Sequence, residues 1–222
     1  MPSANGGIGI LSLLTFLPLL GALVLLFMPA ERVKDIRIFT LIVSVLTFGV
    51  SLGVLQKFNG STFHFQLVES MPWIPNLGIS YKLGVDGISI WLILLTTLLM
   101  VLSVAFSWYV DKRVKQYMAF LLLLETTMLG VFLSLDLVLF YTFFEASLIP
   151  MYFLINIWGG ERRSYAAVKF FIYTFAGSIF MLVGIIALSQ IYRQQFGSPS
   201  FDLVAIQSAI AGGKFWTGFL QW

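Results

Sequence analysis

The sequence predicts an all-α integral membrane protein with about six transmembrane helices, and three observations carry that prediction. Of its 222 residues, 59% are hydrophobic and only 10% are charged, whereas about a quarter of the residues of a typical soluble domain are charged. Windows of roughly 20 mainly apolar residues, long enough to cross a bilayer, recur along the chain. The loops between them alternate between rich and poor in Lys and Arg.

The predicted spans are residues 8–28, 36–55, 88–109, 117–134, 137–158 and 165–191. The first has no basic segment before it and no clear small-residue cleavage site, so it is interpreted as a helix rather than a signal peptide. Pro18 lies inside the first span and Pro150 inside the fifth. Membrane helices tolerate such prolines better than soluble helices do.

The segments outside the spans suggest a chain that continues. Residues 56–87 contain prolines, glycines and aromatic residues suited to a short hairpin or an interfacial turn. From Gln190 the chain turns polar, then runs through the weakly amphipathic FDLVAIQSAIAGG to KFWTGFLQW, which is typical of the start of another helix. We expect residues 1–222 to form a single membrane domain, the N-terminal fragment of a longer subunit.

The distribution of basic residues predicts the orientation. Eight lie in the first, third and fifth loops, and four lie in the segments on the other side: Arg32, Lys34, Arg37, Lys112, Arg113, Lys115, Arg162 and Arg163 against Lys57, Lys82, Arg193 and Lys214. Cytoplasmic loops carry the excess of Lys and Arg. The N-terminus is therefore predicted to lie outside.

Composition excludes several classes of function. The chain has no cysteine, which excludes disulfides, iron–sulfur ligation and thiol catalysis within it. Its single histidine, His64, is predicted to be plain surface, and no P-loop or catalytic triad is present. The net charge is only +3 and its basic residues lie in short membrane loops, so no nucleic-acid binding, metal site or cofactor is expected in this chain.

Glu145 is the most informative residue, because it lies near the middle of the fifth span. An ionised carboxylate at a helix centre costs roughly 2.5–3.5 kcal/mol even on insertion scales, and such residues usually face a bundle interior or a watery cavity. At 100° per residue, Tyr141, Tyr152 and Asn156 fall within about 40° of it. The fifth span is thus predicted to carry a narrow polar stripe.

Pro150 strengthens the interpretation of Glu145. It has no N–H for the carbonyl of Ala146, so the helix should kink and leave an acceptor that water can use. A buried carboxylate beside broken backbone indicates a site that holds a proton, whose affinity a movable cation could switch. The alternative is a structural glutamate that bonds to a neighbouring helix.

Three further ionisable residues complete the candidate proton pathway, each with an alternative. Lys169, one turn into the sixth span between Tyr165 and Tyr173, could instead extend to the membrane surface. Glu125 is buried in the fourth span, as a proton relay or in a structural ion pair with Lys169. Asp136 could simply cap the fifth span and complement its dipole.

Several of these residues lie in motifs that resemble a known family. LGVDGISIWLILLT, MPWIP and VFLSLDLVLFYTFFEASLIPMYFLINIWGGERRSYAAVKFFIYTFAGS are similar to subunit M (chain 4) of the proton-translocating NADH–quinone oxidoreductase, respiratory complex I. The likeness runs from about Pro72 through the sixth span. Members of this antiporter-like family are about twice as long and build their helices as inverted repeats.

The resemblance implies roles for the matching residues. Glu145 occupies the place of the key acid of the fifth helix, Lys169 that of the lysine of the sixth helix, and Asp136 that of the acidic residue in LSLDL. The family's central lysine pair would lie beyond Trp222. This chain alone is therefore not expected to hold a complete proton path.

The resemblance implies that the protein translocates protons, coupled to electron transfer from NADH to quinone. It is expected to be a multi-pass protein of the bacterial plasma membrane. NADH, flavin, iron–sulfur clusters and quinone are expected in partner subunits. The bilayer and other membrane subunits, especially neighbouring antiporter-like ones, are the expected partners. Two alternatives remain: a subunit of a multisubunit cation/proton antiporter, and a structural membrane scaffold.

Overall fold

The computed structural model describes residues 9–212 and confirms six helices long and apolar enough to cross a membrane. They are α1 (Ile10–Phe27), α2 (Val33–Lys57), α3 (Ser89–Phe106), α4 (Val114–Leu133), α5 (Leu137–Trp158) and α6 (Arg163–Phe196). Strands β1 (Gln66–Ile74) and β2 (Ile79–Val85) join α2 to α3, and a short α7 (Leu203–Ala211) follows α6. The predicted bounds of the fifth span coincide with those of α5, and the other five differ by a few residues.

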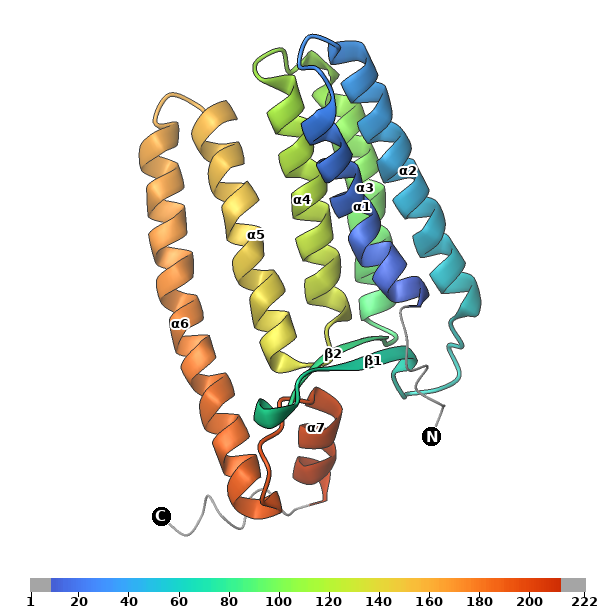
Figure 1. Ribbon diagram of the computed structural model, residues 1–222, viewed down its shortest axis with the longest axis vertical. Helices are drawn as coiled ribbons and strands as arrows, with labels where there is room; N and C mark the ends of the chain where they lie inside the picture. Colours follow the sequence, from blue (N-terminus) through green and yellow to red (C-terminus); the bar gives the residue numbers. More distant parts are fainter. Residues whose placement is uncertain (1–8, 213–222) are drawn as a thin grey trace.

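Helices α1 to α4 pack as a bundle, and α5 and α6 lie beside it with α5 between α4 and α6 (Figure 1). The bundle has two apolar core clusters. The first includes Leu25, Ile36, Val104, Met118 and Leu122. The second includes Leu11, Leu14, Ile93, Leu129 and Leu133. In the most apolar window of each helix, 33–56% of residues are buried in α1 to α4 but only 17% in α5 and 11% in α6.

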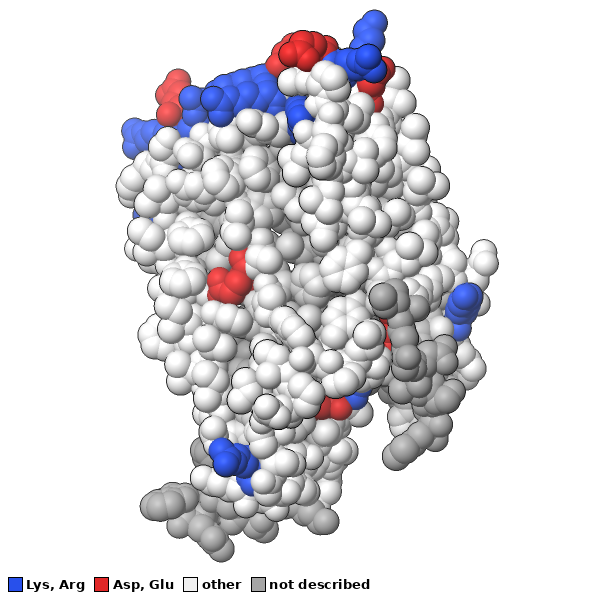
Figure 2. Space-filling view, in the orientation of Figure 1, with Lys and Arg blue, Asp and Glu red and all other residues white. Residues whose placement is uncertain are grey.

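The two ends of the bundle differ in charge (Figure 2). The basic end carries the α1–α2, α3–α4 and α5–α6 connections, where Lys and Arg gather. The hairpin end carries β1, β2 and α7 (Figure 1). This arrangement puts the loops that the sequence grouped by charge on the same side.

The predicted hairpin is confirmed as an antiparallel β1–β2 pair. Its turn is a 3-10 turn, Pro75–Leu77, followed by Gly78 in the left-handed region at φ 70°. A Cβ at Gly78 would come within 2.3 Å of the carbonyl oxygen of Pro199. The turn therefore needs glycine both for its backbone conformation and for close contact with the segment before α7.

Glu69 of the hairpin caps the first transmembrane helix. Its carboxylate accepts hydrogen bonds from the backbone N–H groups of Leu11 (2.7 Å) and Ser12 (3.0 Å) and from the Ser12 hydroxyl. Helix N-termini leave backbone donors unpaired and favour a negative charge. Tyr81 completes the cluster at 2.8 Å from Ser12 Oγ, and burial raises the pKa of the Tyr81 hydroxyl.

At the basic end, cationic side chains bond the last carbonyls of helices. Lys115 Nζ donates to the carbonyls of Leu26 and Met28 at 2.8 Å, at the end of α1. Between the α3–α4 connection and the end of α5, Lys112 Nζ donates to the carbonyl of Ile157 at 3.3 Å, and Trp158 Nε1 donates to the carbonyl of Lys112 at 2.7 Å. Positive charge at helix C-termini complements the helix dipole.

Helix α6 extends beyond the predicted span of residues 165–191, because it runs 34 residues from Arg163 to Phe196. Its polar last turns contain three Gln and one Arg, which are good helix formers in water as well. Gly197, at φ 80°, ends it, and its N–H donates to the carbonyl of Arg193 at 2.8 Å. The further helix predicted in KFWTGFLQW lies outside the described residues.

Gly78→Ala should destabilise the hairpin end. The alanine has to keep a positive φ, which destabilises the folded protein by roughly 1–2 kcal/mol. Its Cβ must also displace the Pro199 carbonyl. Gly60→Ala is the matched control, because nothing lies within 4 Å of a Cβ there. Thermal unfolding of the purified membrane protein should show a lower midpoint for Gly78→Ala alone. Equal midpoints for the two variants would contradict this account of the turn.

Candidate functional site

Glu145 lies near the middle of α5, eight residues after Leu137, which is about 12 Å along the helix axis. Its side chain is partly buried, and its Oε1 atom is buried without a hydrogen-bond partner among the described residues. Tyr141, one turn earlier, lies within electrostatic reach of Glu145 and of Ser178 in α6. The carboxylate therefore lies at the α5–α6 contact, deep in the span.

The predicted polar stripe of α5 faces α6 along its whole length. The Tyr152 ring packs edge-on against Phe171 with ring centroids 5.9 Å apart. Near the basic end, Asn156 Oδ1 accepts a hydrogen bond from Ser164 Oγ at 2.9 Å. The helical period of the sequence predicts that these α5 residues share one face, and the structure shows that this face contacts α6.

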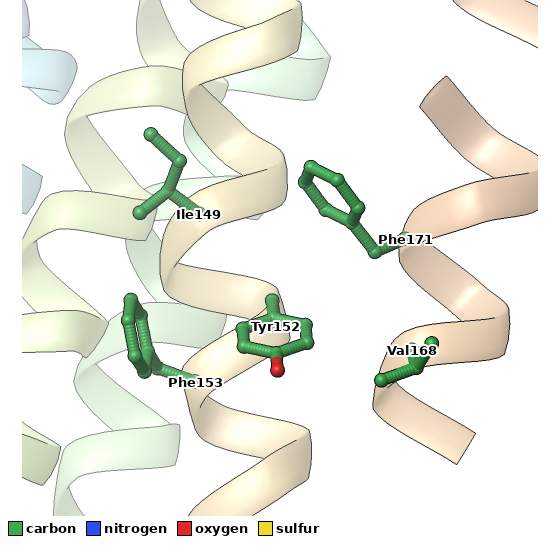
Figure 3. Close-up of a pocket in the computed structure, with 5 residues that line it drawn as sticks. All are labelled: Ile149, Tyr152, Phe153, Val168 and Phe171. Carbon is green, nitrogen blue, oxygen red and sulfur yellow. The ribbon is translucent and has the colours of Figure 1, made fainter. Parts of the chain in front are cut away.

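A groove between α5 and α6 begins one turn from Glu145. It has a volume of about 340 Å³ and is lined by Ile149, Tyr152, Phe153, Val168 and Phe171. Figure 3 shows the first three side chains coming from α5 and the other two from α6, with the Tyr152 hydroxyl the one polar atom drawn among them. Its walls are apolar, so the groove accommodates a side chain or a lipid tail more readily than an ion.

Pro150 does not interrupt α5, which remains one helix from Leu137 to Trp158. The chemical consequence predicted for the proline still holds, because Pro150 cannot donate to the carbonyl of Ala146. That carbonyl lies one residue after Glu145. It offers an acceptor for water beside the carboxylate.

Lys169 lies on a different face of α6 from the residues that meet α5. It is exposed, and its Nζ atom lies 5.7 Å and 5.8 Å from the ring centroids of Tyr165 and Tyr173. This confirms the predicted flanking by two tyrosines and gives the ammonium two cation–π contacts. The structure does not bring Lys169 and Glu145 together.

Glu125 is fully buried in α4, and neither of its carboxyl oxygens has a hydrogen-bond partner in the part of the chain that the structure describes. The predicted alternative of an ion pair with Lys169 was wrong. Helix α5 lies between α4 and α6 (Figure 1), and Lys169 is on the exposed side of α6. A carboxyl in such surroundings is expensive to ionise.

Asp136 caps α5, as one of the two predicted interpretations stated. Its Oδ1 atom accepts from the N–H groups of Val138 (2.9 Å) and Leu139 (3.2 Å). Its Oδ2 atom accepts from the N–H (2.8 Å) and hydroxyl (3.1 Å) of Ser80 in β2. Asp136 therefore joins the start of α5 to the hairpin.

Sequence reasoning missed the α6 side of the site. Ser164, Val168, Phe171 and Ser178 contact α5, at spacings of four, three and seven residues. That is the period of one helical face. The signal was present, but a nearly uniformly apolar helix gives no contrast by which to choose this face over another.

Comparison with known proteins agrees with this geometry. Residues 134–216, which include α5 and α6, match the family model described as NADH:quinone oxidoreductase/Mrp antiporter, TM. The chain is 51% identical to NADH-quinone oxidoreductase subunit M of Rhodobacter capsulatus over 81% of this chain and 35% of the relative. It is 43% identical to NADH-ubiquinone oxidoreductase chain 4 of Arabidopsis thaliana, over 80% of this chain and 36% of that one.

Solved structures show the same fold. A chain of respiratory complex I from Thermus thermophilus with bound NADH superposes with a TM-score of 0.74 at 28% identity, covering 90% of this chain and 39% of that chain. A chain of the Mrp complex from Dietzia sp. DQ12-45-1b gives a TM-score of 0.63 at 19% identity, covering 86% and 20%. The second likeness concerns the fold alone.

The fold and the intramembrane carboxylates thus define an antiporter-like, multi-pass membrane chain of the kind found in these complexes. Within that class, the sequence is similar to subunit M (chain 4) of NADH–quinone oxidoreductase. The chain spans between about a third and under half of the length of these relatives, 35% and 43% for two of them.

Replacing Asp136 should lower stability in a graded way. Asp136→Ala removes a cap and leaves the partly buried Ser80 donors without their acceptor, at about 1–3 kcal/mol. Asp136→Asn keeps one acceptor oxygen and should lose less. Thermal unfolding should therefore rank wild type above Asn and Asn above Ala.

Asp35→Ala is the control for the Asp136 series, because Asp35 is an exposed acidic residue in the first turn of α2. Its midpoint should stay close to that of wild type. An Asp136→Ala protein as stable as the control would show that the cap contributes nothing measurable.

Proposed function

We propose that this chain forms part of the proton-translocating membrane arm of an NADH–quinone oxidoreductase, with Glu145 as its proton-loading site. One observation carries the proposal: a carboxylate in mid-span, facing α6, with a buried oxygen atom that has no hydrogen-bond partner within residues 9–212. Intramembrane acids of this kind are rare and mark proton and ion pathways. The names of the relatives support the electron-transfer partner.

The chemistry at Glu145 follows from its surroundings. A cation brought near a carboxylate favours its charged form, and withdrawal of the cation favours the protonated form. A change in cation position therefore loads or releases one proton. Tyr141, the hydroxyl of Ser178 and the free carbonyl of Ala146 supply donors and acceptors for water that connects the carboxyl to its surroundings.

The other candidate residues take different roles. Lys169 is proposed as a cation near the basic end of the path, held between two tyrosine rings. Glu125 is proposed as a further proton carrier in the bundle. Asp136 is proposed as a positioning residue, which fixes where α5 begins and hence the depth of Glu145.

The proposed partners supply what this chain lacks. Iron–sulfur clusters are held by cysteine thiolates, and the sequence contains no cysteine. NADH, flavin, clusters and quinone therefore belong to partner subunits in this proposal. The exposed faces of α5 and α6 are proposed to contact lipid and neighbouring membrane subunits, including antiporter-like ones.

Two alternatives give different results. A cation/proton antiporter would share the fold, but it would be isolated without dehydrogenase subunits. A structural scaffold would use Glu145 only to hold helices together. Relatives named for NADH–quinone oxidoreductase at up to 51% identity support the first proposal over the antiporter.

Glu145→Gln should abolish most proton translocation while the complex still assembles, because glutamine keeps the size of the side chain but cannot ionise. Glu145→Asp should retain part of the activity, since water can bridge the missing methylene. The measurement is NADH-driven proton uptake in membrane vesicles, with blotting to confirm assembly. Glu161→Gln, in the exposed α5–α6 connection, should behave as wild type.

Moving the carboxylate tests its direction as well as its charge. In the Glu145→Gln background, Ile149→Glu places an acid in the α5–α6 groove. Thr142→Glu places it in a different groove, beside Phe16 and Tyr81. Ile149→Glu should restore more pumping than Thr142→Glu.

An assembled Glu145→Gln complex that pumps protons like wild type would contradict the proton-loading role of Glu145 and leave the structural scaffold as the explanation.

The orientation is proposed from the basic end, which should face the cytoplasm and place the N-terminus outside a bacterial plasma membrane. Cysteines introduced at Ser61 and Ser164 should label from outside and inside, respectively. The natural chain has no cysteine to interfere. Labelling of both from one side with a membrane-impermeant reagent would refute this topology.

A further inference from the structure

The first four helices contain a buried polar layer that the proposed path through α5 does not use. On α4, the residues one turn before Glu125 (Leu121 and Leu122) belong to the first core cluster, and Leu129 belongs to the second. Glu125 thus lies between two apolar clusters. It is 0% exposed, and both of its oxygens lack partners within residues 9–212.

Three buried hydroxyl groups of α2 lie in the same bundle. Ser44, Thr47 and Ser51 are each 0% exposed, and their spacings of three and four residues put them on one helical face. Ser51 continues the row to Thr97 of α3, with 3.0 Å between their hydroxyl oxygens. Ser44 Oγ has no partner among the described residues, so Glu125 is not the only unsatisfied group here.

The depth of these groups can be compared through one contact. A Cβ on Gly21 of α1 would lie 2.8 Å from Val43 of α2 and 3.2 Å from Leu122 of α4, so the three helices meet there. From that point towards the hairpin end, Glu125 is three residues along α4, about 4.5 Å, and Thr47 is four residues along α2, about 6 Å. The two lie at nearly the same depth.

Helix α1 brings a free backbone acceptor about one turn nearer the hairpin end than Glu125. Pro18 is three residues from Gly21 in the same direction, because α1 runs antiparallel to α2 and α4 (Figure 1). Proline has no N–H, so the carbonyl of Leu14 lacks its donor within the helix. Leu14 is 0% exposed and belongs to the second core cluster with Leu129.

We propose that Glu125 is a second proton-holding site, which exchanges its proton with water bound between α1, α2 and α4. Buried water typically needs two to four polar partners. Glu125 and Ser44 supply unpartnered groups at this depth, and Thr47 supplies an acceptor, because its hydroxyl donates to the Val43 carbonyl of its own helix at 2.9 Å. The Leu14 carbonyl adds an acceptor about one turn nearer the hairpin end. The site deepens the proposed function and rests on it for its role in translocation, but not for its existence.

The row of hydroxyls gives the site a direction. From Ser44 through Thr47 to Ser51, α2 runs towards the hairpin end (Figure 1). Protons from Glu125 therefore exchange with that side of the membrane, through the α1–α4 bundle rather than through the α5–α6 contact. Glu145 and Glu125 become separate sites on two sides of the α4–α5 packing.

The test is infrared spectroscopy of the assembled complex in membranes, on transfer from water to deuterium oxide. Wild type should show a carboxylic-acid carbonyl band that shifts on deuteration, is lost in Glu125→Gln and persists in Glu145→Gln. Should Glu125→Gln fail to assemble, Glu125→Asp should move the band instead. No band assignable to Glu125, or one that never shifts in deuterium oxide, would overturn the proposal.

Two variants locate the water. Ser44→Ala removes the unpartnered hydroxyl and should slow deuteration of the Glu125 band several-fold. Thr126→Val is the matched control, because the Thr126 hydroxyl is buried next to Glu125 but bonds the Leu122 carbonyl of its own helix at 3.0 Å. Unchanged exchange in Ser44→Ala would refute the site between the three helices. None of these spectroscopic measurements depends on proton pumping. Failure of the proposed translocation function would therefore be distinguished from failure of the Glu125 site.

Discussion

The structure depends on one constraint: within a bilayer, every polar group needs a partner inside the protein. Most of this chain satisfies it with unbroken helices whose Ser and Thr hydroxyls bond carbonyls of their own helix, as Thr40 and Thr96 do. Among the described residues, the Nε atom of Arg37 is an exception near the basic end, and the exceptions deeper in the spans are located at two places. Glu125 and Ser44 lie in the α1–α4 bundle, and Glu145 lies at the α5–α6 contact.

The hairpin end shows the same constraint at the membrane boundary, where charges can be used to join elements. Glu69 satisfies the first donors of α1, Asp136 those of α5, and Asp202 that of Val204 in α7. Lys82 of β2 pairs with Asp202 at 2.5 Å. The starts of three helices are thereby joined to a single hairpin. Because Asp136 fixes where α5 begins, it also fixes the depth of Glu145 in the membrane.

The sequence predicted what depends on hydrophobicity along one helix. Six spans, the hairpin, the cap at Asp136 and the common face of Glu145, Tyr152 and Asn156 all follow from local pattern. It could not predict contacts between distant segments. Nothing near Gly9 indicates that Glu69 will cap α1 from 57 residues away, and no pattern placed α5 between Glu125 and Lys169.

The difference between the predicted spans and the helix ends has a related cause. Outside the hydrocarbon layer, hydropathy no longer distinguishes helix from loop, so α6 continued past the apolar window until Gly197 ended it. Within the layer, almost every side of α6 is apolar, and the face that meets α5 depends on the partner. The low burial of α5 and α6, 17% and 11% of their apolar windows, reflects how little of these two helices the described residues cover.

The two carboxyl sites differ in a way that matters for moving protons. Glu145 lies beside a groove and close to surfaces that other helices or subunits can cover, so cations from outside this segment can reach it. Glu125 is 0% exposed within the α1–α4 bundle of the segment itself, so a cation from outside has no direct access to it. A site of the first kind can be switched by its neighbours, whereas a site of the second kind holds its proton until water reaches it. Such a difference in access would allow adjacent sites to exchange protons in sequence rather than together.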